Sequence, residues 1–496
     1  MIYDQVVVGS GISGLVAATI LAQYGHRVAL IEQAPVLAPV LRGFSRQGIY
    51  YDTGFHYSGG LGDGEVLDVL FRYLGIAEKL EKYSFAADRF DTFRDVETQE
   101  EFHFPIGREA LRDRLCTAFP QEREGIDKYL AMVQEACQAI PYLNLDLEFG
   151  QVKPLLGVHG PSLGEVLDRL IGNAALKGLL SMHSLLYGVP PDQVPFFLHA
   201  SVAGLYYESV HGLKGGGLSL VQAFEQRLDE LGVDVFLGQA AQKFSFATNG
   251  TLAGVTMADG EVVACRNCVA TVHPQVFLDL VPPELLRPVY RRRLETLEET
   301  VSAIMLYAAC EIPSQLLQGT NLFLGRLGQP LKGLGGGALE ERPIYMAGTA
   351  PDEKGLGARG FVAICPAEQD CTARWSDSRW GKRPAEYLRF KEATMERMQC
   401  HIERSCPELR GTFKVATGAT PLTIRDFAAN PAGGLYGVKH RVGQYNPMAR
   451  TRVPGLFLAG QAVVAPGVLG GALSGFLTCG QMLGQDQLLE GVKACS

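Results

Sequence analysis

The chain has 496 residues, whereas a single domain typically has ~150, so we expect two or more lobes. With 47% hydrophobic and 20% charged residues, the composition is that of a folded globular protein and excludes a disordered or fibrous chain. The formal net charge of −8 argues against a general phosphate-binding surface, so nucleic acid is not an expected partner.

The eleven cysteines are scattered along the chain and do not have the spacing of a small secreted disulfide framework. The N-terminus carries an acid at Asp4 and no basic leader. We therefore expect a reducing, cytoplasmic location. The uncharged stretch between Arg452 and Asp486 is long enough to cross a bilayer, but Pro454 and Pro466 favour a buried strand, loop and helix there.

The N-terminal segment predicts a β-α-β unit, with strands over residues 5–8 and 27–31 and a helix over residues 12–24. Residues 65–151 are rich in charge and leucine at helical spacing, and residues 162–210 continue the pattern with more aromatic side chains. We expect a helical insertion whose second half forms an apolar wall.

The chain beyond the insertion alternates between β-rich and helical patterns. Hairpin pairs at Asn249-Gly250 and Asp259-Gly260 predict a small β-meander over residues 232–272. Later segments predict a β-rich run, a charged helical stretch, a short strand and a final helix, at residues 302–366, 374–406, 455–459 and 469–483. We expect the final strand and helix to rejoin the first lobe, which makes that lobe discontinuous in sequence.

A GxGxxG motif follows the first predicted strand and opens the first predicted helix. Gly9 permits a tight turn, Gly11 lets a diphosphate approach the backbone, and Gly14 lets helix and strand pack closely. Glu32 ends the second strand, where an acid accepts hydrogen bonds from ribose hydroxyls and disfavours a 2′-phosphate, leaving NAD or FAD. The residues expected to bind the nucleotide here are Gly9, Ser10, Gly11, Ile12, Ser13, Gly14, Glu32 and Gln33.

This start, the later meander and the glycine-rich end together resemble the FAD-dependent amine oxidase and phytoene desaturase superfamily. Five further segments are similar to retinol saturases and carotenoid isomerases: YGVPPDQ at 187–193, FFLHA at 196–200, LKGGGLSLVQAF at 213–224, ATPLTIRDF at 419–427 and LFLAGQAVVAPGVLGGALSG at 456–475. The resemblance covers nearly the whole chain. It implies that the nucleotide is FAD.

The segment RGFSRQGIYYDTGFHYSGG looks like the second flavin-contacting loop of that superfamily, especially at Asp52, Gly54 and His56. Ala38-Pro39 stands where relatives usually have a glycine pair. The backbone near the diphosphate is therefore expected to follow a different route, which bears on the predicted FAD contacts of Arg42 and Gly43. Gly460-Gln461 replaces the Gly-Asp of many relatives, and glutamine still accepts and donates hydrogen bonds. The second set of residues expected to bind FAD is Arg42, Gly43, Gly54, His56, Ala241, Gly460, Gln461, Leu469, Gly470, Gly471 and Ala472.

The last glycine-rich segment is expected to hold the flavin ring. Gly470 and Gly471 permit close approach, and the following helix N-terminus directs N–H groups and a positive dipole end toward the flavin pyrimidine. Helix packing is the alternative explanation for the same glycines.

The resemblance implies an α/β fold with three parts. A discontinuous Rossmann-like FAD-binding domain takes residues 1–75, 213–280 and 450–496. Residues 76–212 form the helical insertion, and residues 281–449 form a mixed α+β substrate domain.

Two other motifs are interpreted as structural. Cys265 and Cys268 form a CxxC inside a β-rich run, and without a second CxxC we interpret them as structural thiols and expect no metal site. The glycine cluster over residues 333–341 follows a polar, proline-containing segment rather than a buried strand. We interpret it as a turn of the substrate domain, so no dedicated NADPH domain is expected.

The titratable residues near these motifs are His56, His199, His211 and His440, each with a structural role as the alternative to acid–base chemistry. Tyr436 and His440 lie where the chain crosses from the substrate domain to the last flavin strand, and they are our catalytic candidates.

The leading hypothesis is an FAD-dependent oxidoreductase that saturates, desaturates or isomerises carbon–carbon double bonds of a hydrophobic isoprenoid or polyene. The apolar insertion suits an apolar tunnel and a peripheral membrane contact, or ordinary core packing. The alternatives are a flavin amine oxidase or dehydrogenase acting on a polar substrate, and a non-catalytic prenyl-binding protein of the same fold. The electron donor or acceptor stays open.

Overall fold

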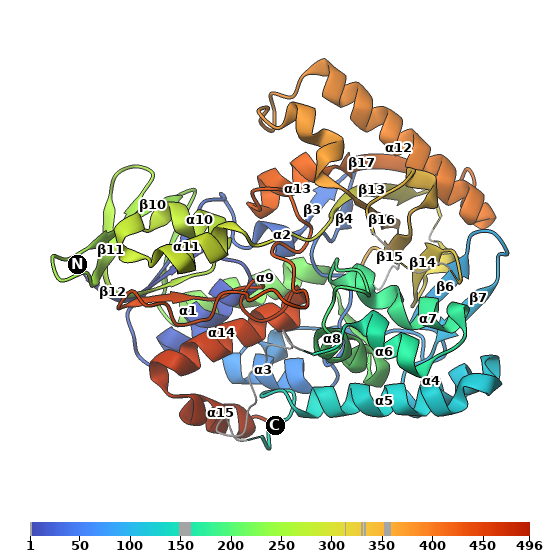
Figure 1. Cartoon of the computed structure of the whole chain (residues 1–496). Coiled ribbons are helices and arrows are strands. Elements are labelled where there is room, and N and C mark those ends of the chain that lie inside the picture. Colours follow the sequence, from blue (N-terminus) through green and yellow to red (C-terminus); the bar gives the residue numbers. More distant parts are fainter. Residues whose placement is uncertain (1, 148–159, 313, 329–330, 332–333, 352–358) are drawn as a thin grey trace.

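The computed structural model describes residues 2–147, 160–312, 314–328, 331, 334–351 and 359–496. Two large β-sheets lie at opposite ends of the molecule, with helices between and around them (Figure 1). Both the N-terminal and C-terminal segments belong to the lobe built on the first sheet.

The first sheet is a parallel nucleotide-binding sheet extended by a meander. Strands β1, β2, β9, β12 and β18 run parallel, and β10, β11 and β12 pair in antiparallel fashion. The strands are β1 (Tyr3–Val8), β2 (Val28–Glu32), β9 (Asp234–Leu237), β10 (Ala241–Phe246), β11 (Leu252–Met257), β12 (Val262–Ala270) and β18 (Leu456–Leu458). β12 joins the last strand of the chain to the first, because it pairs with both β1 and β18.

Helices cover both faces of this sheet. One face packs against α1 (Ile12–Gln23), α3 (Val66–Leu74), α9 (Gly216–Glu230), α14 (Gly467–Leu483) and α15 (Gln485–Lys493), and the other against α10 (Pro274–Leu280) and α11 (Pro288–Glu295). α1 and α14 are apolar all round, which is the pattern of helices buried in a core. No helix among the described residues is long and apolar enough to span a bilayer.

The second sheet has seven strands in the order β17-β13-β16-β15-β14-β6-β7. These are β6 (Asp91–Asp95), β7 (Glu101–Phe104), β13 (Ser302–Cys310), β14 (Asn321–Gly325), β15 (Ile344–Gly348), β16 (Gly360–Ala367) and β17 (Phe413–Ala419). One face packs on α12 (Ala385–Ser405) and the other on the insertion. Smaller elements are α2 (Pro39–Arg42), α13 (Pro421–Ala428) and the pairs β3 (Phe44–Arg46) with β4 (Ile49–Tyr51) and β5 (Lys82–Ser84) with β8 (His211–Leu213).

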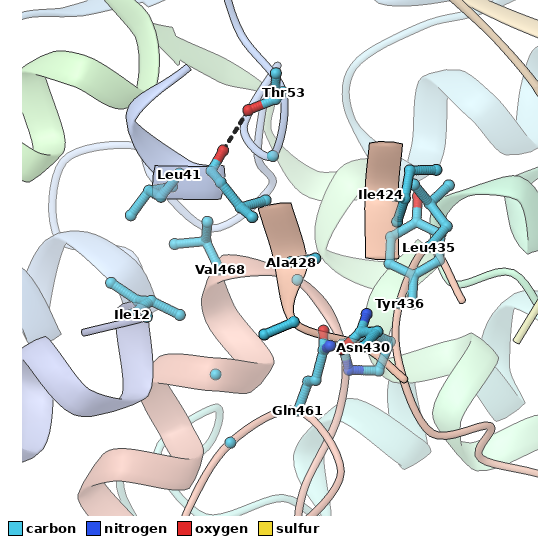
Figure 2. Close-up of a pocket in the computed structure, with 18 of the residues that line it drawn as sticks. Ile12, Leu41, Thr53, Ile424, Ala428, Asn430, Leu435, Tyr436, Gln461 and Val468 are labelled. Carbon is cyan, nitrogen blue, oxygen red and sulfur yellow. Dashed lines mark hydrogen bonds between the residues drawn. The ribbon is translucent and has the colours of Figure 1, made fainter. Parts of the chain in front are cut away.

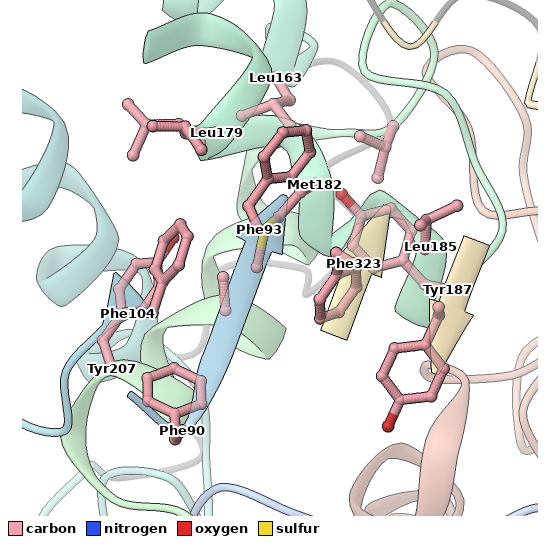
Figure 3. Packing of buried hydrophobic residues seen from close by; sticks show 14 of the residues in the cluster. Phe90, Phe93, Phe104, Leu163, Leu179, Met182, Leu185, Tyr187, Tyr207 and Phe323 are labelled. Atoms are coloured by element: carbon pink, nitrogen blue, oxygen red, sulfur yellow. The ribbon is translucent and has the colours of Figure 1, made fainter. Parts of the chain in front are cut away.

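The insertion contains five α-helices in its described part, namely α4 (Arg108–Ala118), α5 (Arg123–Gln138), α6 (Leu163–Leu170), α7 (Ala174–Ser181) and α8 (Phe196–Glu208). Figure 3 shows side chains of this insertion, including Leu163, Leu179 and Met182, beside Phe93 and Phe323 of the second sheet. Many of its apolar residues therefore form a core with the second sheet. None of the large exposed apolar side chains of the described residues lies between residues 76 and 212.

The expectation of a helical insertion without strands is wrong at β6 and β7, which complete the second sheet. The charges of β6 concealed the strand because they are paired inside the protein. Asp91 accepts from Tyr57 and Asn321, and Arg94 bonds to Glu101 and Glu408. Charged residues in a sequence usually indicate an exposed segment, whereas every residue of β6 is buried.

Candidate active site

A cavity of about 1580 Å³ connects the edge of the first sheet with the inner face of the second. In Figure 2, Ile12 of α1 and Val468 of α14 approach it from one side and Ile424 and Ala428 of α13 from another. Gln461, in the β18–α14 segment, lies near Asn430 and Tyr436. Segments from both ends of the chain thus border the same space.

The β1–α1 turn opens into this cavity through Gly9, Ser10, Gly11, Ile12 and Ser13. α1 has no side-chain N-cap, so N–H groups of its first turn are available to an anion. A Cβ atom built on Gly11 meets no protein atom within 4 Å, whereas one on Gly9 would lie 2.5 Å from Thr271 Oγ1. The space beside Gly11 is therefore open, and the space beside Gly9 is filled by the protein.

Gly14 does not line the cavity. Its Cβ would lie 1.9 Å from the carbonyl oxygen of Gly9, so Gly14 serves the close contact between helix and strand. Thr271, at the end of β12, was not anticipated from the sequence. Its hydroxyl donates to the carbonyl oxygens of Val8 and Gly9, and these bonds hold the β1–α1 turn against the end of β12.

Glu32 ends β2 at the cavity and is 7% exposed. One carboxylate oxygen accepts from the Ser10 amide at 2.8 Å and the Ser10 hydroxyl at 2.6 Å, and the other accepts from the Ala34 amide at 2.8 Å. These bonds hold the carboxylate in place and leave lone pairs for a ligand hydroxyl, since a carboxylate offers about four acceptor sites. Gln33 and Ala241 also line this end.

Gly470 and Gly471 of α14 line the cavity, but contacts within the protein already require them. A Cβ on Gly471 would lie 2.4 Å from Ile12 Cγ2, and a Cβ on Gly470 would lie 2.4 Å from the Ala465 carbonyl oxygen. Helix packing, the alternative weighed for this segment, accounts for Gly471, whereas Gly470 is required by its close contact with the turn that precedes α14. Gly460, Gln461 and Leu469 line the cavity as well, whereas Ala472 is buried in α14 and does not.

The predicted second loop is only partly at the cavity. Gly43, Gly54 and His56 line it. Arg42 does not, because its guanidinium is paired with Glu225 of α9 at 2.6 Å. Asp52 does not either, because it accepts from the Gly217 amide at the start of α9 at 2.7 Å.

Ala38 adopts φ 45° and ψ 58°, the left-handed conformation that favours glycine. Its amide donates to the Ser10 hydroxyl at 2.8 Å, which links it to Glu32 through Ser10. At Ala38-Pro39, where relatives usually have a glycine pair, the backbone thus makes a left-handed turn with alanine in place of glycine.

Tyr436 and His440 both line the cavity. The Tyr436 hydroxyl donates to the Leu185 carbonyl oxygen at 3.0 Å, and burial raises the pKa of Tyr436. Nε2 of His440 lies 2.7 Å from the Gln461 carbonyl oxygen, and Nδ1 lies 3.2 Å from the Asn446 side-chain nitrogen. Because a carbonyl only accepts, Nε2 carries the hydrogen. Burial lowers the pKa of His440, consistent with a neutral ring.

The remaining sequence candidates lie outside the cavity. His199 is fully buried between the hydroxyls of Tyr129 and Tyr187, and His211 lies in β8. Cys265 and Cys268 are buried free thiols of β12, and burial raises the pKa of Cys265 to about 12. No cluster of His, Cys, Asp and Glu suited to a metal occurs in the described part of the chain. Residues 334–341 of the glycine cluster end in a 3-10 turn beside the second sheet, and residue 333 lies outside the described residues.

A transverse row of the second sheet forms an apolar wall. Ala419, Met305, Ile364 and Tyr345 are register partners on adjacent strands β17, β13, β16 and β15, and all four line the cavity. α8 adds Phe197, Leu198, Val202, Leu205 and Tyr206. Strand alternation alone could not show which face of this sheet meets the cavity.

The residues present fit FAD. The cavity continues from the Gly11 turn and Glu32 to Gln461 and the apolar wall, and two helix N-termini without side-chain caps, those of α1 and α14, border it. The open space at Gly11 suits a diphosphate, and the carboxylate of Glu32 suits ribose hydroxyls.

The family model for flavin containing amine oxidoreductase matches residues 12–333. Human all-trans-retinol 13,14-reductase is 25% identical over 99% of this chain and 87% of its own length. The 4,4′-diapophytoene desaturase of Staphylococcus haemolyticus is 20% identical over 89% of each chain, and carrot chloroplastic prolycopene isomerase is 24% identical over 54% of this chain and 46% of its own.

Among solved structures, an oxidoreductase from Methanosarcina mazei superposes with a TM-score of 0.67 at 16% identity, covering 96% of this chain and 99% of that one. This likeness concerns the fold. The family match covers more than half of the chain, from Ile12 at the start of α1 through Glu32 and the strands β2 to β14. The chain belongs to the flavin-containing amine oxidoreductase family and is an FAD-dependent oxidoreductase.

Proposed function

We propose that this enzyme exchanges a hydride between FAD and a carbon–carbon bond of an apolar isoprenoid or conjugated polyene. The observation that carries the proposal is that one continuous cavity joins the nucleotide turn at Gly11 to the apolar wall of Met305 and Ile364. Such a chamber excludes water and orients a chain that has few polar handles. When bound, the flavin supplies the hydride chemistry.

The charges at the cavity argue against a cationic amine as substrate. Among the described lining residues, the carboxylates are Glu32 and Asp426. Glu32 is held by three hydrogen bonds, and Asp426 is paired with Arg383 and Arg425. Neither is free to neutralise an ammonium group, which is costly to desolvate without a partner. The open space at Gly11 likewise argues against a prenyl carrier that has lost its nucleotide.

Saturation is the direction to test first. The relatives with the longest matched spans are named reductases, although a desaturase and an isomerase also match. Saturation of a double bond adds one hydride and one proton. The protons of Tyr436 and His440 are both directed at backbone carbonyl oxygens, so we propose that these residues position the Leu185 and Gln461 segments at the cavity.

We also propose a peripheral membrane contact at the cavity rim rather than at the insertion. Large apolar side chains that are exposed and also line the cavity are Val36, Val40, Trp380, Leu388 and Phe427. Arg46 and Lys391 lie on the same cavity. Exposed apolar side chains beside cations suit an anionic bilayer surface, and co-sedimentation with anionic vesicles that the Trp380→Ser variant loses would support the contact.

The reaction is tested with purified holoenzyme under anaerobic conditions. We expect photoreduced enzyme to be reoxidised by a conjugated polyene, with a saturated product identified by mass spectrometry. Reduction of the oxidised enzyme by polyenes would reverse the direction, and an isomerised product without net oxidation would indicate isomerisation. Fast reduction by amines alone would replace the proposal with amine oxidation, and a folded protein that takes up no FAD would remove the enzymatic assignment.

A further inference from the structure

His56 carries an imidazole that no protein group holds. It lies in the loop between β4 and α3, lines the cavity and is partly exposed. Within the described residues, no hydrogen bond or ion pair engages either ring nitrogen, and neither nitrogen is closed off from solvent. A neutral imidazole has one donor and one acceptor nitrogen. His56 can therefore exchange a proton with a molecule in the cavity.

The other histidines along the described cavity wall are engaged within the protein. His440 directs its hydrogen at a backbone carbonyl oxygen of the β18–α14 segment at 2.7 Å. One ring nitrogen of His273 accepts from the Gln275 amide at 3.2 Å. The other nitrogen of His273 is buried and lies 3.4 Å from Glu299. Of these rings, only that of His56 is free to act on a ligand.

The remaining titratable groups of the described cavity wall are also accounted for. The hydroxyl of Tyr345 is fully buried, and both lining carboxylates, Glu32 and Asp426, are held by bonds within the protein. Arg46 is exposed, and Lys391 lies one turn from an exposed leucine of α12, so both cations belong to the rim. The other lining tyrosines use their hydroxyls in bonds within the protein, namely Tyr57, Tyr206, Tyr307, Tyr387 and Tyr436.

The position of His56 is next to the apolar wall. Its ring centroid lies 5.8 Å from that of Tyr345, which belongs to the transverse row of the second sheet. Burial raises the pKa of Tyr345, and the nearby phenol of Tyr436 raises it further. Tyr436 in turn lies near Gln461 of the segment that precedes α14 (Figure 2). His56 is thus placed where an apolar chain along the wall comes close to the segments expected to hold the flavin.

The environment of His56 also makes the ring suitable for proton transfer. Burial lowers the pKa of His56 to about 4. The ring is therefore neutral near pH 7 and can accept a proton. Its protonated form is a stronger acid than an ordinary imidazolium, so it gives its proton up readily.

We infer that His56 passes the proton of the reaction between solvent and a substrate carbon. The inference rests on the proposed function and names the residue that serves it as acid or base. In saturation, one carbon of the double bond takes the hydride that the reduced flavin supplies as it is oxidised. The π electron pair forms a C–H bond between the neighbouring carbon and the imidazolium proton as the N–H bond breaks. Water then reprotonates the ring, and desaturation is the reverse.

The test follows the flavin spectrum of anaerobic holoenzyme after rapid mixing. Lycopene and all-trans-retinol are the probes for photoreduced enzyme, and phytoene is the probe for oxidised enzyme. We expect His56→Gln to slow the reaction with these probes at least about 100-fold, the usual contribution of a general acid or base. Its FAD content and its reoxidation by ferricenium, which places no proton on carbon, should match the wild type. The control is His211→Gln, outside the cavity, which should react as the wild type does.

His56→Ala separates proton transfer from a structural role. The truncation leaves space beside the cavity, so added imidazole should raise the rate of His56→Ala with the probes as its concentration increases. The same imidazole should not accelerate the wild type. No increase at any imidazole concentration would assign the ring a structural role and overturn the inference.

The outcomes distinguish the role of His56 from the proposed function. If the wild type reacts with a probe and His56→Gln reacts at a similar rate, the role of His56 is wrong and the proposed function stands. A folded His56→Gln that retains no FAD would also overturn the inference, because it would assign the ring to the cofactor. If no probe reacts with FAD-loaded wild type in either direction, the proposed function fails and the role of His56 with it.

Discussion

The hydroxyl of Ser13 in α1 donates a hydrogen bond to the carbonyl oxygen of Gly471 in α14 at 2.7 Å, although 458 positions separate the two residues. Beside this bond, Gly475 brings α14 so close to Val16 that a Cβ would lie 2.7 Å from Val16 Cγ1. Gly471 and Gly475, four residues apart on α14, thus present a face without side chains to Ile12 and Val16 of α1. The two ends of the chain border the cavity together because α1 and α14 pack closely through these glycines.

Gly471→Ala should lower the free energy of unfolding by about 1–3 kcal/mol, because its Cβ would overlap Ile12 Cγ2. Denaturant unfolding measures the loss. Ile12→Ala removes the overlapping atoms, so the double variant should be more stable than the sum of the two single losses by at least about 0.5 kcal/mol. Strict additivity would mean that the two side chains do not meet.

Gly11→Val should abolish FAD retention without unfolding the protein. The Cβ position at Gly11 is free of protein atoms, so the valine branches would occupy the space assigned to the diphosphate. The ratio of flavin to protein absorbance after gel filtration measures retention, and circular dichroism checks the fold. Gly11→Ala, with a single methyl group, should keep more flavin than the valine variant. Full flavin content in folded Gly11→Val would contradict the assignment.

Ala38→Gly should raise the free energy of unfolding by about 1 kcal/mol, because glycine adopts φ 45° without the steric cost that alanine bears there. Thermal unfolding of the holoenzyme is the measurement. Ala22→Gly in α1 is a suitable control, since glycine in a regular helix should destabilise the protein instead. Destabilisation of Ala38→Gly by a similar amount would show that the left-handed turn is not present in solution.

Asp52 should make stability fall as pH rises. Burial raises the pKa of Asp52 to about 7, against hydrogen bonds from the Gly217 amide and Tyr50 hydroxyl that lower it. Between about pH 4 and pH 7 the folded protein keeps a proton on Asp52 that the unfolded chain has released. The contribution of Asp52 to the free energy of unfolding therefore decreases as the pH rises through this window. Each pKa unit corresponds to about 1.4 kcal/mol.

The matched variant is Asp52→Asn, whose amide oxygen still accepts from Gly217 but does not titrate. The free energy of unfolding of the wild type relative to Asp52→Asn should therefore decline between about pH 4 and pH 7 and change little above that. Urea unfolding at several pH values measures this difference. A difference that does not change with pH would mean that Asp52 is ionised in the folded protein throughout.

The sequence was informative wherever local geometry and chemistry coincide. The β1–α1 turn requires its residues for reasons that act within the motif, so Gly9, Gly11 and Glu32 could be singled out from the sequence. The order of strand, loop and helix at β18 and α14 could be inferred from the prolines and glycines of that segment. The domain boundaries and the ligand contacts of individual residues stay predictions. The family resemblance correctly predicted the FAD-dependent fold.

Other features of the site depend on partners far along the chain and could not be predicted from local sequence. Arg42 has the chemistry of a phosphate ligand, but Glu225, far along the chain, holds it away from the cavity. Asp52 likewise serves the start of α9. The contact between Gly471 and Ile12 is likewise invisible in the local sequence, and the role of Gly471 at the flavin stays a prediction. Tyr345 carries no motif at all, and only the register of four strands brings it to the cavity.

The pairing of β18 with β12 also has a consequence for biosynthesis. While the ribosome is still translating the residues before Leu456, the nascent chain already displays β1, α1 and β12 but lacks the strand and helix that complete the lobe. The groove against which α14 packs is then exposed apolar surface, a natural target for chaperones. Tight capture of the flavin must accordingly await synthesis of β18 and α14.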